Sequence, residues 1–504
     1  MAWPRRVFSS DLGVLILLAL ARLALHLLTD GQYGFHRDEL ATLDDARTLA
    51  WGYVAYPPLT PFVARLALDL FGPSLVGLRL FSAAAQCVAM VLTGLMAREL
   101  GGGRWAQVVA ALAAASVPLS LIQAALFQYV AFDYLWLVLI AYCSLRLLNS
   151  GNPRWWLAIG VVAGLGLLTR YTIGFFLAAL AVGVLLTSAR RWLTSRWLWG
   201  GVALASLIWL PNLVWQVQHG FISVEFLSAI HARDIALGRT RGYLLEQLYV
   251  TANPVTLPLW ATGLWFYLLA PSGRSYRLLG WLYVVSFLLL WVVQGRSYYL
   301  GPAYPMLLSA GAVVVDRWLA ARGVTPARVG RGITWLGLAV ACAVGAALSL
   351  PIAPVQSALW SVASTVQDNF VEEIGWPDLV QTVAGIYAAL PADTRSNTAI
   401  LAGNYGEAGA VDLYGPAGGL PQAISGVDSY WLRGYPDPPP QTLIVLGYHQ
   451  DELTAFFDAC DLAGHVTNSY GVRNEETSAH PEIFVCRQPR QPWPVLWQML
   501  RRFS

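Results

Sequence analysis

Two adjacent acidic residues near the start of the sequence are the first candidates for chemistry. Asp38 and Glu39 follow the first long apolar run by ten residues and begin a segment that ends in Tyr56-Pro57-Pro58-Leu59. Paired carboxylates beside a membrane surface can accept protons or bind polar substrates. The alternative is that acids in the first turn of a helix complement its dipole and stay solvated, and spacing alone favours this alternative.

The composition indicates what must position these residues. The chain has 504 residues, of which 57% are hydrophobic and 12% are charged, and 22 are Trp. No single water-soluble core needs so much apolar material, so we predict a polytopic α-helical membrane protein. The chain contains no Lys, and its net charge of +3 does not by itself argue for or against nucleic acid. We expect no nucleic-acid partner.

Apolar runs long enough to cross about 30 Å of hydrocarbon predict eleven spans. They lie near 11–28, 75–97, 105–120, 132–148, 155–169, 171–188, 197–216, 251–270, 278–294, 301–319 and 332–350. The first run follows Arg5 and Arg6 but lacks the small-residue cleavage pattern of a signal peptide, so we expect it to remain as an anchor.

Arginine placement predicts the orientation. With the N-terminus in the cytoplasm, the loops on the inner side satisfy the positive-inside rule. These loops hold Arg5, Arg6, Arg98, Arg104, Arg146, Arg154, Arg190, Arg191, Arg196, Arg274, Arg277, Arg317, Arg322, Arg328 and Arg331. Loops 29–74, 217–250 and 295–300 then lie outside, together with the tail after Pro351.

The predicted domains are a membrane domain, residues 1–350, and a soluble outer domain, residues 351–504. No segment after 350 is long and apolar enough to span a bilayer. Strand-like runs at 399–401, 442–446 and 483–485 alternate with helix-like segments near 377–390 and 451–460, which predicts a small α/β domain. In loop 29–74 we expect two helices lying on the membrane interface.

The five cysteines divide into two groups. Cys87, Cys143 and Cys342 fall in predicted spans and are interpreted as small apolar core residues. Cys460 and Cys486 lie in the outer domain, where an oxidising compartment permits a disulfide but does not require one.

Short motifs occur in a fixed order along nearly the whole chain. They are Asp38-Glu39-Leu40, Gly52-Tyr53 with Pro57-Pro58-Leu59, Arg98 to Gly102, Thr169-Arg170-Tyr171, Asn253-Pro254, Ser297-Tyr298-Tyr299 with Pro302 to Pro305, Asn404 to Ala410, and Ser425-Gly426 with Ser429-Tyr430-Trp431. This order resembles the GT-C class of membrane glycosyltransferases. The resemblance is to the family 39 and 83 group, which includes protein O-mannosyltransferases and the lipid A aminoarabinose and galacturonic acid transferases.

The resemblance implies a GT-C fold and transfer of a sugar, with inversion, from a polyprenyl-phosphate carrier. The acceptor would be a lipid, glycan or protein at the outer face of the bacterial cytoplasmic membrane. Inverting transfer needs a carboxylate that takes the acceptor proton as the leaving group departs. Asp38 is the expected base. Glu39 is the second catalytic candidate, but adjacent helical side chains point about 100° apart, so it would have a different part.

The resemblance also implies residues that bind the donor or acceptor. Asp133 stands where the family has a second acidic residue, at the start of a helix on the outer face. The alternative is that Asp133 only caps the N-terminus of that helix. Arg170 and Arg296 occupy places where the family often has Lys, and they could bind the lipid phosphate, or else snorkel at the interface. Their motif neighbours are Tyr171, Tyr298 and Tyr299. His36 and Tyr56 are further candidates, although the aminoarabinose transferase has Lys where this chain has Tyr56.

We expect no cofactor and no essential metal. His219 and His231 lie in loop 217–250 and could suggest a metal, but their spacing matches no dense ligand motif and favours solvated loop residues. No Walker or Rossmann glycine pattern follows a predicted strand, which argues against a nucleotide-sugar donor.

Other functions stay open. Protein O-mannosylation is the runner-up specificity within the enzyme class. A transporter or flippase of lipid-linked sugars, or a non-catalytic scaffold, is the alternative of another class. Transporters tend to have internal repeats and mid-membrane charges, whereas no convincing repeat is present and the unusual charges gather on one side. The sugar, the acceptor and the oligomeric state are not predicted.

Overall fold

A computed structural model describes residues 10–504, so the expectation for Arg5 and Arg6 lies outside the described residues. The described chain divides into two compact units. The membrane unit consists of the chain up to Asp30, Arg79–His219 and His231–Leu350, and the sheet unit consists of Gly31–Leu78, Gly220–Ile230 and Pro351–Ser504.

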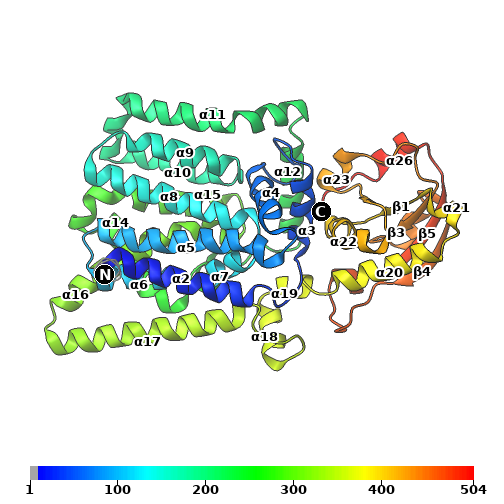
Figure 1. The fold of residues 1–504 in the computed structure, drawn as a ribbon. Helices are drawn as coiled ribbons and strands as arrows, with labels where there is room; N and C mark the ends of the chain where they lie inside the picture. The colour runs from blue at the N-terminus through cyan, green and yellow to red at the C-terminus, as the bar shows by residue number, and fades with distance from the viewer. Residues whose placement is uncertain (1–9) are drawn as a thin grey trace, which may run out of the picture. The chain divides into compact units, whose positions relative to one another are not determined.

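The membrane unit is a set of long helices (Figure 1). They are α2 Asp11–Thr29, α5 Leu75–Glu99, α6 Arg104–Ala115, α7 Pro118–Ala125, α8 Tyr129–Ser150, α9 Trp155–Leu167, α10 Ile173–Leu186, α11 Arg196–Gln218, α13 Tyr243–Tyr249, α14 Leu257–Leu268, α15 Arg277–Val292, α16 Tyr304–Ala320 and α17 Val324–Ser349. Helix α5 and helix α12, Ile222–Ala236, begin in the sheet unit and end in the membrane unit. Short 3-10 segments are η1 Ser188–Thr194, η2 Pro254–Thr256, η3 Pro271–Tyr276 and η4 Ser297–Ala303.

Each of the eleven predicted spans overlaps a helix of this unit, but the number of spans is not confirmed. Among residues 10–504, seven helices are long and apolar enough to cross a membrane, or nine if two bent helix pairs each count as one span. The predicted span 105–120 is one of these pairs: α6 and α7 meet at 65°. Pro118 begins α7, which explains the break because proline cannot continue a preceding helix.

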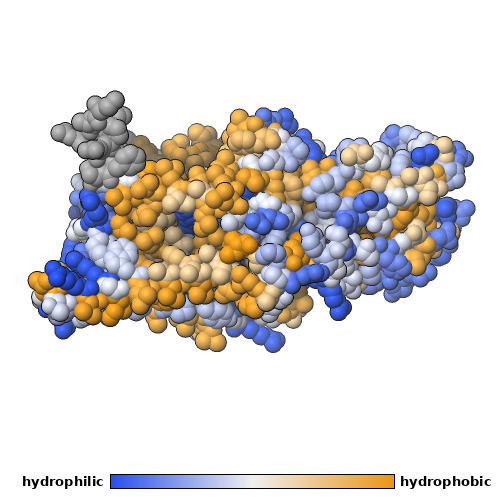
Figure 2. Space-filling view, turned by 60° about the horizontal axis from the view of Figure 1, so that its bottom comes forward, coloured by the Kyte–Doolittle hydropathy of each residue, from blue (hydrophilic) through white to orange (hydrophobic). Residues whose placement is uncertain are grey.

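The surface of the membrane unit matches a lipid environment. Large apolar side chains project outward from α2, α11 and α17, and the exposed ones include Leu17, Leu20, Leu207, Ile333 and Leu336. Hydrophobic residues gather broadly over the face of this unit that Figure 2 shows. Water-soluble proteins rarely expose so much contiguous apolar surface. The chain is therefore a multi-pass membrane protein.

Glycines let neighbouring membrane helices approach each other closely. A Cβ added to Gly160 of α9 would overlap the backbone at Gly201 of α11, and a Cβ on Gly201 would overlap the carbonyl of Trp156. Helices α14 and α16 meet in the same way through Gly263 and Gly311. Small residues at such crossings allow the close packing that associates helices in lipid.

The sheet unit combines a five-stranded sheet with short helices. Its helices are α3 Arg37–Arg47, α4 Leu59–Phe71, α18 Ala358–Val366, α19 Asn369–Glu372, α20 Trp376–Ala389, α21 Ala392–Arg395, α22 Tyr405–Tyr414, α23 Asp428–Arg433, α24 Gln450–Leu453, α25 Glu475–Ser478 and α26 Trp493–Met499, with η5 Gly415–Gly418. The strands are β1 Thr398–Leu401, β2 Ala423–Ile424, β3 Thr442–Val445, β4 Phe457–His465 and β5 Glu482–Pro489. The strand order is β2-β1-β3-β5-β4.

The sheet confirms the expected α/β domain. Strand β1 pairs in parallel with β2 and β3, whereas β5 is antiparallel to both β3 and β4. The three predicted strand runs correspond to β1, β3 and β5, and α20 corresponds to the predicted helix near 377–390. The helix expected near 451–460 is wrong: it is replaced by the one-turn α24 and the start of edge strand β4.

The cysteines of the sheet unit form a disulfide. Cys460 of β4 is directly opposite Cys486 of β5, with Cα atoms 4.1 Å apart, and the two sulfurs are bonded. This pairing ties the edge strand to its neighbour. Cys87 and Cys143 are buried and Cys342 is half-buried, all as free thiols.

Loop 29–74 contains the two expected helices, α3 and α4, and their placement on the membrane interface stays a prediction. Most of α3 is buried, including its acidic residues Glu39, Asp44 and Asp45, and it packs against α22. Helix α4 differs, because Leu66, Leu70 and Phe71 project from it into the surroundings.

Candidate active site

The structure distributes the predicted site residues over both units. The sheet unit holds His36, Asp38, Glu39 and Tyr56, and the membrane unit holds Asp133, Arg170, Tyr171, Arg296, Tyr298 and Tyr299. Each group has its own geometry.

His36 begins the helix that carries the acidic pair. It is the N-cap of α3, and its ring Nδ1 accepts the backbone N–H of Asp38 at 3.2 Å. His36 itself is buried. This cap satisfies one of the unpaired N–H groups of the first turn. It also fixes the backbone from which the Asp38 side chain projects.

Glu39 completes a capping box rather than facing outward. Its Oε2 accepts the backbone N–H of His36 at 2.9 Å, and its side chain is fully buried. This reciprocal pair of bonds stabilises a helix start. The geometry therefore gives Glu39 a structural role, in which its carboxylate does not exchange a proton.

Asp38 is the more accessible of the two carboxylates. Its side chain is 35% exposed, and Oδ2 lies 3.9 Å from Nδ1 of His36. Its Oδ1 accepts the hydroxyl of Tyr405, the first residue of α22, at 2.8 Å. Burial, reinforced by the charge of Asp38, raises the pKa of Tyr405 well above its usual value. The tyrosine is thus a hydrogen-bond donor at physiological pH.

Tyr56 contacts a different carboxylate. Its hydroxyl donates to Oδ2 of Asp45 at 2.5 Å, while Arg433 of α23 donates to Oδ1 of Asp45 at 2.6 Å and to Asp44 at 2.8 Å. Burial raises the pKa of Asp45 to about 6, although Arg433 and Tyr56 act in the opposite direction. Tyr56 thus helps to hold α3 in place.

In the membrane unit, Arg170 is enclosed by aromatic rings. Its guanidinium carbon lies 4.4 Å from the ring centre of Tyr299, 5.0 Å from that of Tyr129 and 5.6 Å from that of Tyr298. The carboxylate of Asp133 is 3.8 Å away. Aromatic faces attract a desolvated cation, so the arginine is held firmly in one place. A snorkelling arginine would instead extend toward water.

Asp133 is not a helix N-cap. Helix α8 begins four residues earlier, at Tyr129, with Gln128 as its N-cap, so the N-cap alternative is wrong. The Asp133 side chain is buried, and its Oδ1 has no hydrogen-bond partner among the described residues. A buried carboxylate oxygen without a donor is costly, and a substrate hydroxyl could supply one.

Tyr171 and Arg296 have firm partners. The Tyr171 hydroxyl bonds Asn212 at 3.1 Å and Gln216 at 2.7 Å, both on α11. Arg296 donates to both oxygens of Asp234, at 2.5 and 2.6 Å. Burial opposes ionisation of Asp234, but these bonds outweigh it and lower its pKa. In this structure Arg296 therefore neutralises a protein carboxylate.

Two buried ionisable residues of α2, and a third at its C-cap, were not predicted. Arg22 donates to the carbonyl and the hydroxyl of Ser120, and His26 lies 3.1 Å from Asp30. The sequence signal was present, because arginine within an apolar run costs free energy unless it is partnered.

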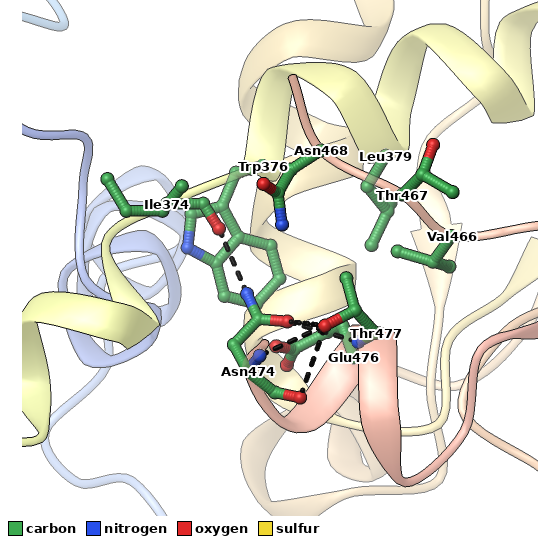
Figure 3. Close-up of a pocket in the computed structure, with 10 residues that line it drawn as sticks. Ile374, Trp376, Leu379, Val466, Thr467, Asn468, Asn474, Glu476 and Thr477 are labelled. Carbon is green, nitrogen blue, oxygen red and sulfur yellow. Dashed lines mark hydrogen bonds between the residues drawn. The ribbon is translucent and has the colours of Figure 1, made fainter. Parts of the chain in front are cut away.

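The sheet unit also contains a small hollow (Figure 3). Ile374, Trp376 and Asn474 are among its lining residues, and none of the predicted site residues lines it. Asn474 donates to the carbonyl of Ile374 at 2.9 Å and accepts the N–H of Thr477 at 3.0 Å. The second bond caps α25 and the first ties it to the segment before α20, so these polar groups of the hollow serve the fold.

The loop histidine His219 has ordinary surroundings, and His231 is exposed. His219 stacks on Trp215 with ring centres 4.0 Å apart, and its Nδ1 lies 2.8 Å from the carbonyl of Trp215. No group of three His, Cys, Asp or Glu side chains suited to a metal ion occurs among residues 10–504. Metal independence stays a prediction.

Solved structures share this architecture. ArnT from Cupriavidus metallidurans bound to undecaprenyl phosphate aligns over 94% of this chain and 97% of its own, with a TM-score of 0.56 and 15% identity. The same protein in its apo state gives a TM-score of 0.57 and 14% identity. This chain has the GT-C fold.

Sequence comparisons agree with the GT-C assignment and confirm the resemblance seen in the motifs. The family described as dolichyl-phosphate-mannose-protein mannosyltransferase matches residues 55–215. The lipid A galacturonosyltransferase RgtD of Rhizobium johnstonii is 27% identical over 232 residues, which are 44% of this chain and 46% of RgtD. The aligned chain thus spans slightly less than half the length of that relative.

Proposed function

We propose that this GT-C protein is an inverting glycosyltransferase that takes its sugar from a polyprenyl-phosphate donor. The observation that carries the proposal is the partly exposed carboxylate of Asp38, held by a hydroxyl donor at the start of a capped helix. The fold supports it, because ArnT, which has the same fold, is described in complex with undecaprenyl phosphate.

Asp38 would act as the general base. As the acceptor hydroxyl oxygen attacks the anomeric carbon, its proton passes to the Asp38 carboxylate. The bond between the anomeric carbon and the phosphate oxygen breaks, and its electron pair leaves with the polyprenyl phosphate. Attack from the side opposite the leaving group inverts the anomeric centre.

Arg170 and Asp133 would bind the donor. A permanently charged guanidinium can stabilise phosphate oxygens, and a carboxylate oxygen can accept a hydrogen bond from a sugar hydroxyl. Tyr298 and Tyr299, which hold Arg170, and Tyr171, which is bonded to α11, would shape this region. Because Arg296 is already paired with Asp234, a weaker role in phosphate binding is assigned to it.

We further propose that residues 1–350 form the transmembrane catalytic domain and that 351–504 lie outside a bacterial cytoplasmic membrane, with the N-terminus inside. The disulfide between Cys460 and Cys486 supports an outer, oxidising location for the sheet. Cysteine-labelling of single-Cys variants in intact cells tests this orientation.

Replacement of Asp38 by Asn tests the function. Asn preserves the shape of the side chain and can still accept the Tyr405 hydroxyl, but it cannot take a proton. We expect turnover to fall by at least about 100-fold while folding and donor affinity persist. The assay measures release of polyprenyl phosphate from undecaprenyl phosphate carrying a labelled uronic acid, pentose or hexose.

The control variant is Asp69→Asn, because Asp69 is an exposed acid on α4 that pairs only with the nearby Arg65 in the bonds described for it. Its turnover should match that of the unmodified protein. Normal turnover by Asp38→Asn would show that Asp38 is not the general base. Transport of the labelled lipid without release of polyprenyl phosphate would instead favour a flippase, and neither activity would favour a scaffold.

The acceptor is proposed to be a lipid, because the relative RgtD is named for transfer to lipid A. Protein O-mannosylation is the second candidate, since the family that matches residues 55–215 is described by that activity. Lipid and glycoprotein profiles of a deletion strain separate them. Loss of a sugar from an envelope lipid supports the first, and loss of protein-linked mannose supports the second.

A further inference from the structure

The tail of the chain contributes a side chain to the carboxylate proposed as the base. Tyr405 and Asp38 are 367 positions apart in sequence, yet the Tyr405 hydroxyl donates to Oδ1 of Asp38 at 2.8 Å. Both residues belong to the sheet unit. A bond between segments so distant in sequence forms only when α22 is seated against α3.

The first turn of α22 is built to hold this tyrosine. Asn404 caps the helix by accepting the N–H of Glu407 at 2.9 Å. Glu407 in return accepts the N–H groups of Asn404 at 3.2 Å and of Gly403 at 2.9 Å. Such a capping box fixes the helix start. Tyr405, the first residue of α22, therefore has little freedom to move along the helix axis.

Glycines bring the two helices close enough for the bond. A Cβ on Gly406 would lie 2.8 Å from the Cβ of Arg37, and a Cβ on Gly409 would lie 2.7 Å from the carbonyl carbon of Leu40. Both distances are too short for real carbon atoms. The motif Asn404 to Ala410 contains none of the predicted site residues. In the structure it supplies a helix cap, a hydroxyl donor and two close contacts between helices.

The ring of Tyr405 is also fixed from the side. The Arg37 guanidinium carbon lies 5.2 Å from its ring centre, within the range of a cation–π contact. Arg37 is itself hydrogen-bonded to Glu475, and it lies 3.6 Å from Glu372. These contacts would hold the ring in place if its hydroxyl were removed.

We propose that Tyr405 is a positioning residue that holds the Asp38 carboxylate in the orientation needed to take the acceptor proton. This inference rests on the proposed function. The hydroxyl bond selects one rotamer of a short, partly exposed side chain. Displacement of a catalytic group by a fraction of an ångström is costly in rate, so the bond should affect turnover more than donor binding.

Tyr405→Phe removes only the hydroxyl and tests the proposal in the full-length protein. Using undecaprenyl phosphate linked to a labelled sugar that the unmodified protein accepts, we expect kcat to fall by roughly 10- to 100-fold. The donor KM should stay within about twofold, because Tyr405 is not assigned to donor binding. A purely structural residue would not give this split between kcat and KM.

Tyr414→Phe is the matched control. Tyr414 is the last residue of the same helix, it is half-buried, and its hydroxyl makes no described bond to Asp38. Its kcat should equal that of the unmodified protein. Thermal melting of both variants shows whether either one loses stability.

A double mutant shows whether Tyr405 acts through Asp38 or contributes to turnover independently of it. If Tyr405 acts through Asp38, adding Tyr405→Phe to Asp38→Asn should lower the residual turnover by less than about twofold, because groups that act as a unit are non-additive. Full additivity, or an unchanged kcat in the single variant, overturns the inference. If the unmodified protein releases no polyprenyl phosphate from any labelled donor, the proposed function itself fails.

Discussion

Asp38 and Glu39 are adjacent in the sequence, but their side chains do different work in the structure. Glu39 is buried and accepts the backbone N–H of His36, whereas Asp38 is partly exposed and accepts a hydroxyl from Tyr405. A carboxylate whose oxygen is committed to a backbone N–H within a closed turn is poorly placed to receive a substrate proton. Of the two, Asp38 is therefore the proposed base.

Two substitutions of Glu39 test this division. Glu39→Gln keeps an oxygen that can accept the N–H of His36, so turnover should stay within about threefold of the unmodified protein. Glu39→Ala removes the acceptor and should destabilise the sheet unit by about 1 kcal/mol or more. Turnover assays and thermal melting measure the two effects. A Gln variant that melts normally but has no turnover would show that Glu39 is catalytic.

At the scale of elements, the crossing of α9 and α11 depends on the absence of side chains. Gly160 and Gly201 face each other so closely that a Cβ on either would overlap backbone atoms of the other helix. Gly201→Ala should force the helices apart and lower the melting temperature of the detergent-solubilised protein by several degrees. Gly332→Ala is the control, because nothing lies within 4 Å of a Cβ at that position of α17. Equal melting of the two variants would contradict this packing.

How much could be predicted from the sequence differs between kinds of element. Long apolar helices were predicted because the thickness of hydrocarbon dictates their length. Edge strand β4 was missed, since segment 457–465 becomes a strand by pairing with β5 and by the Cys460–Cys486 bond, not by its own pattern. The start of α8 was misplaced, because the predicted span began at 132 whereas the helix begins at Tyr129.

The candidate site was predictable only in part, for a related reason. Motifs pointed to Asp38, Asp133 and Arg170, but not to their partners. The bond from Tyr405 to Asp38 spans 367 positions and that from Arg433 to Asp45 spans 388, and nothing local in the sequence indicates such pairs. The role of Tyr56 as a donor to Asp45 likewise became visible only with the fold.

At the scale of the whole molecule, the sheet unit is assembled from three separate stretches of chain. Gly31–Leu78 and Gly220–Ile230 join the tail from Pro351 onward. Arg433 binds the first stretch to the tail through Asp44 and Asp45, and Arg501 pairs with Glu225 of the second at 2.7 Å. The placement of Asp38 thus depends on contacts that the tail makes with the first loop.

A proton retained by Asp412 predicts a pH dependence of stability. Asp412 of α22 is hydrogen-bonded to Asp44, and burial together with that neighbour raises the pKa of Asp412 to about 8. Its carboxyl also faces the N–H of Ala423 at 2.7 Å, and Arg433 and Arg47 are the nearby cations. The folded state therefore retains a proton that the unfolded chain, with an ordinary pKa near 4, gives up.

Because the folded pKa is the higher one, the stability that this proton contributes is complete below about pH 4 and is lost as pH rises through about 8. Melting of the full-length protein should occur at lower temperature at pH 8.5 than at pH 5. Asp412→Asn can donate to Asp44 and accept from Ala423 at every pH, so it should reduce the proton uptake linked to folding by up to about one proton. Some slope should remain, because burial also raises the pKa of Glu407 to about 8. An unchanged slope in the Asn variant, or greater stability of the unmodified protein at the higher pH, would contradict the raised pKa of Asp412.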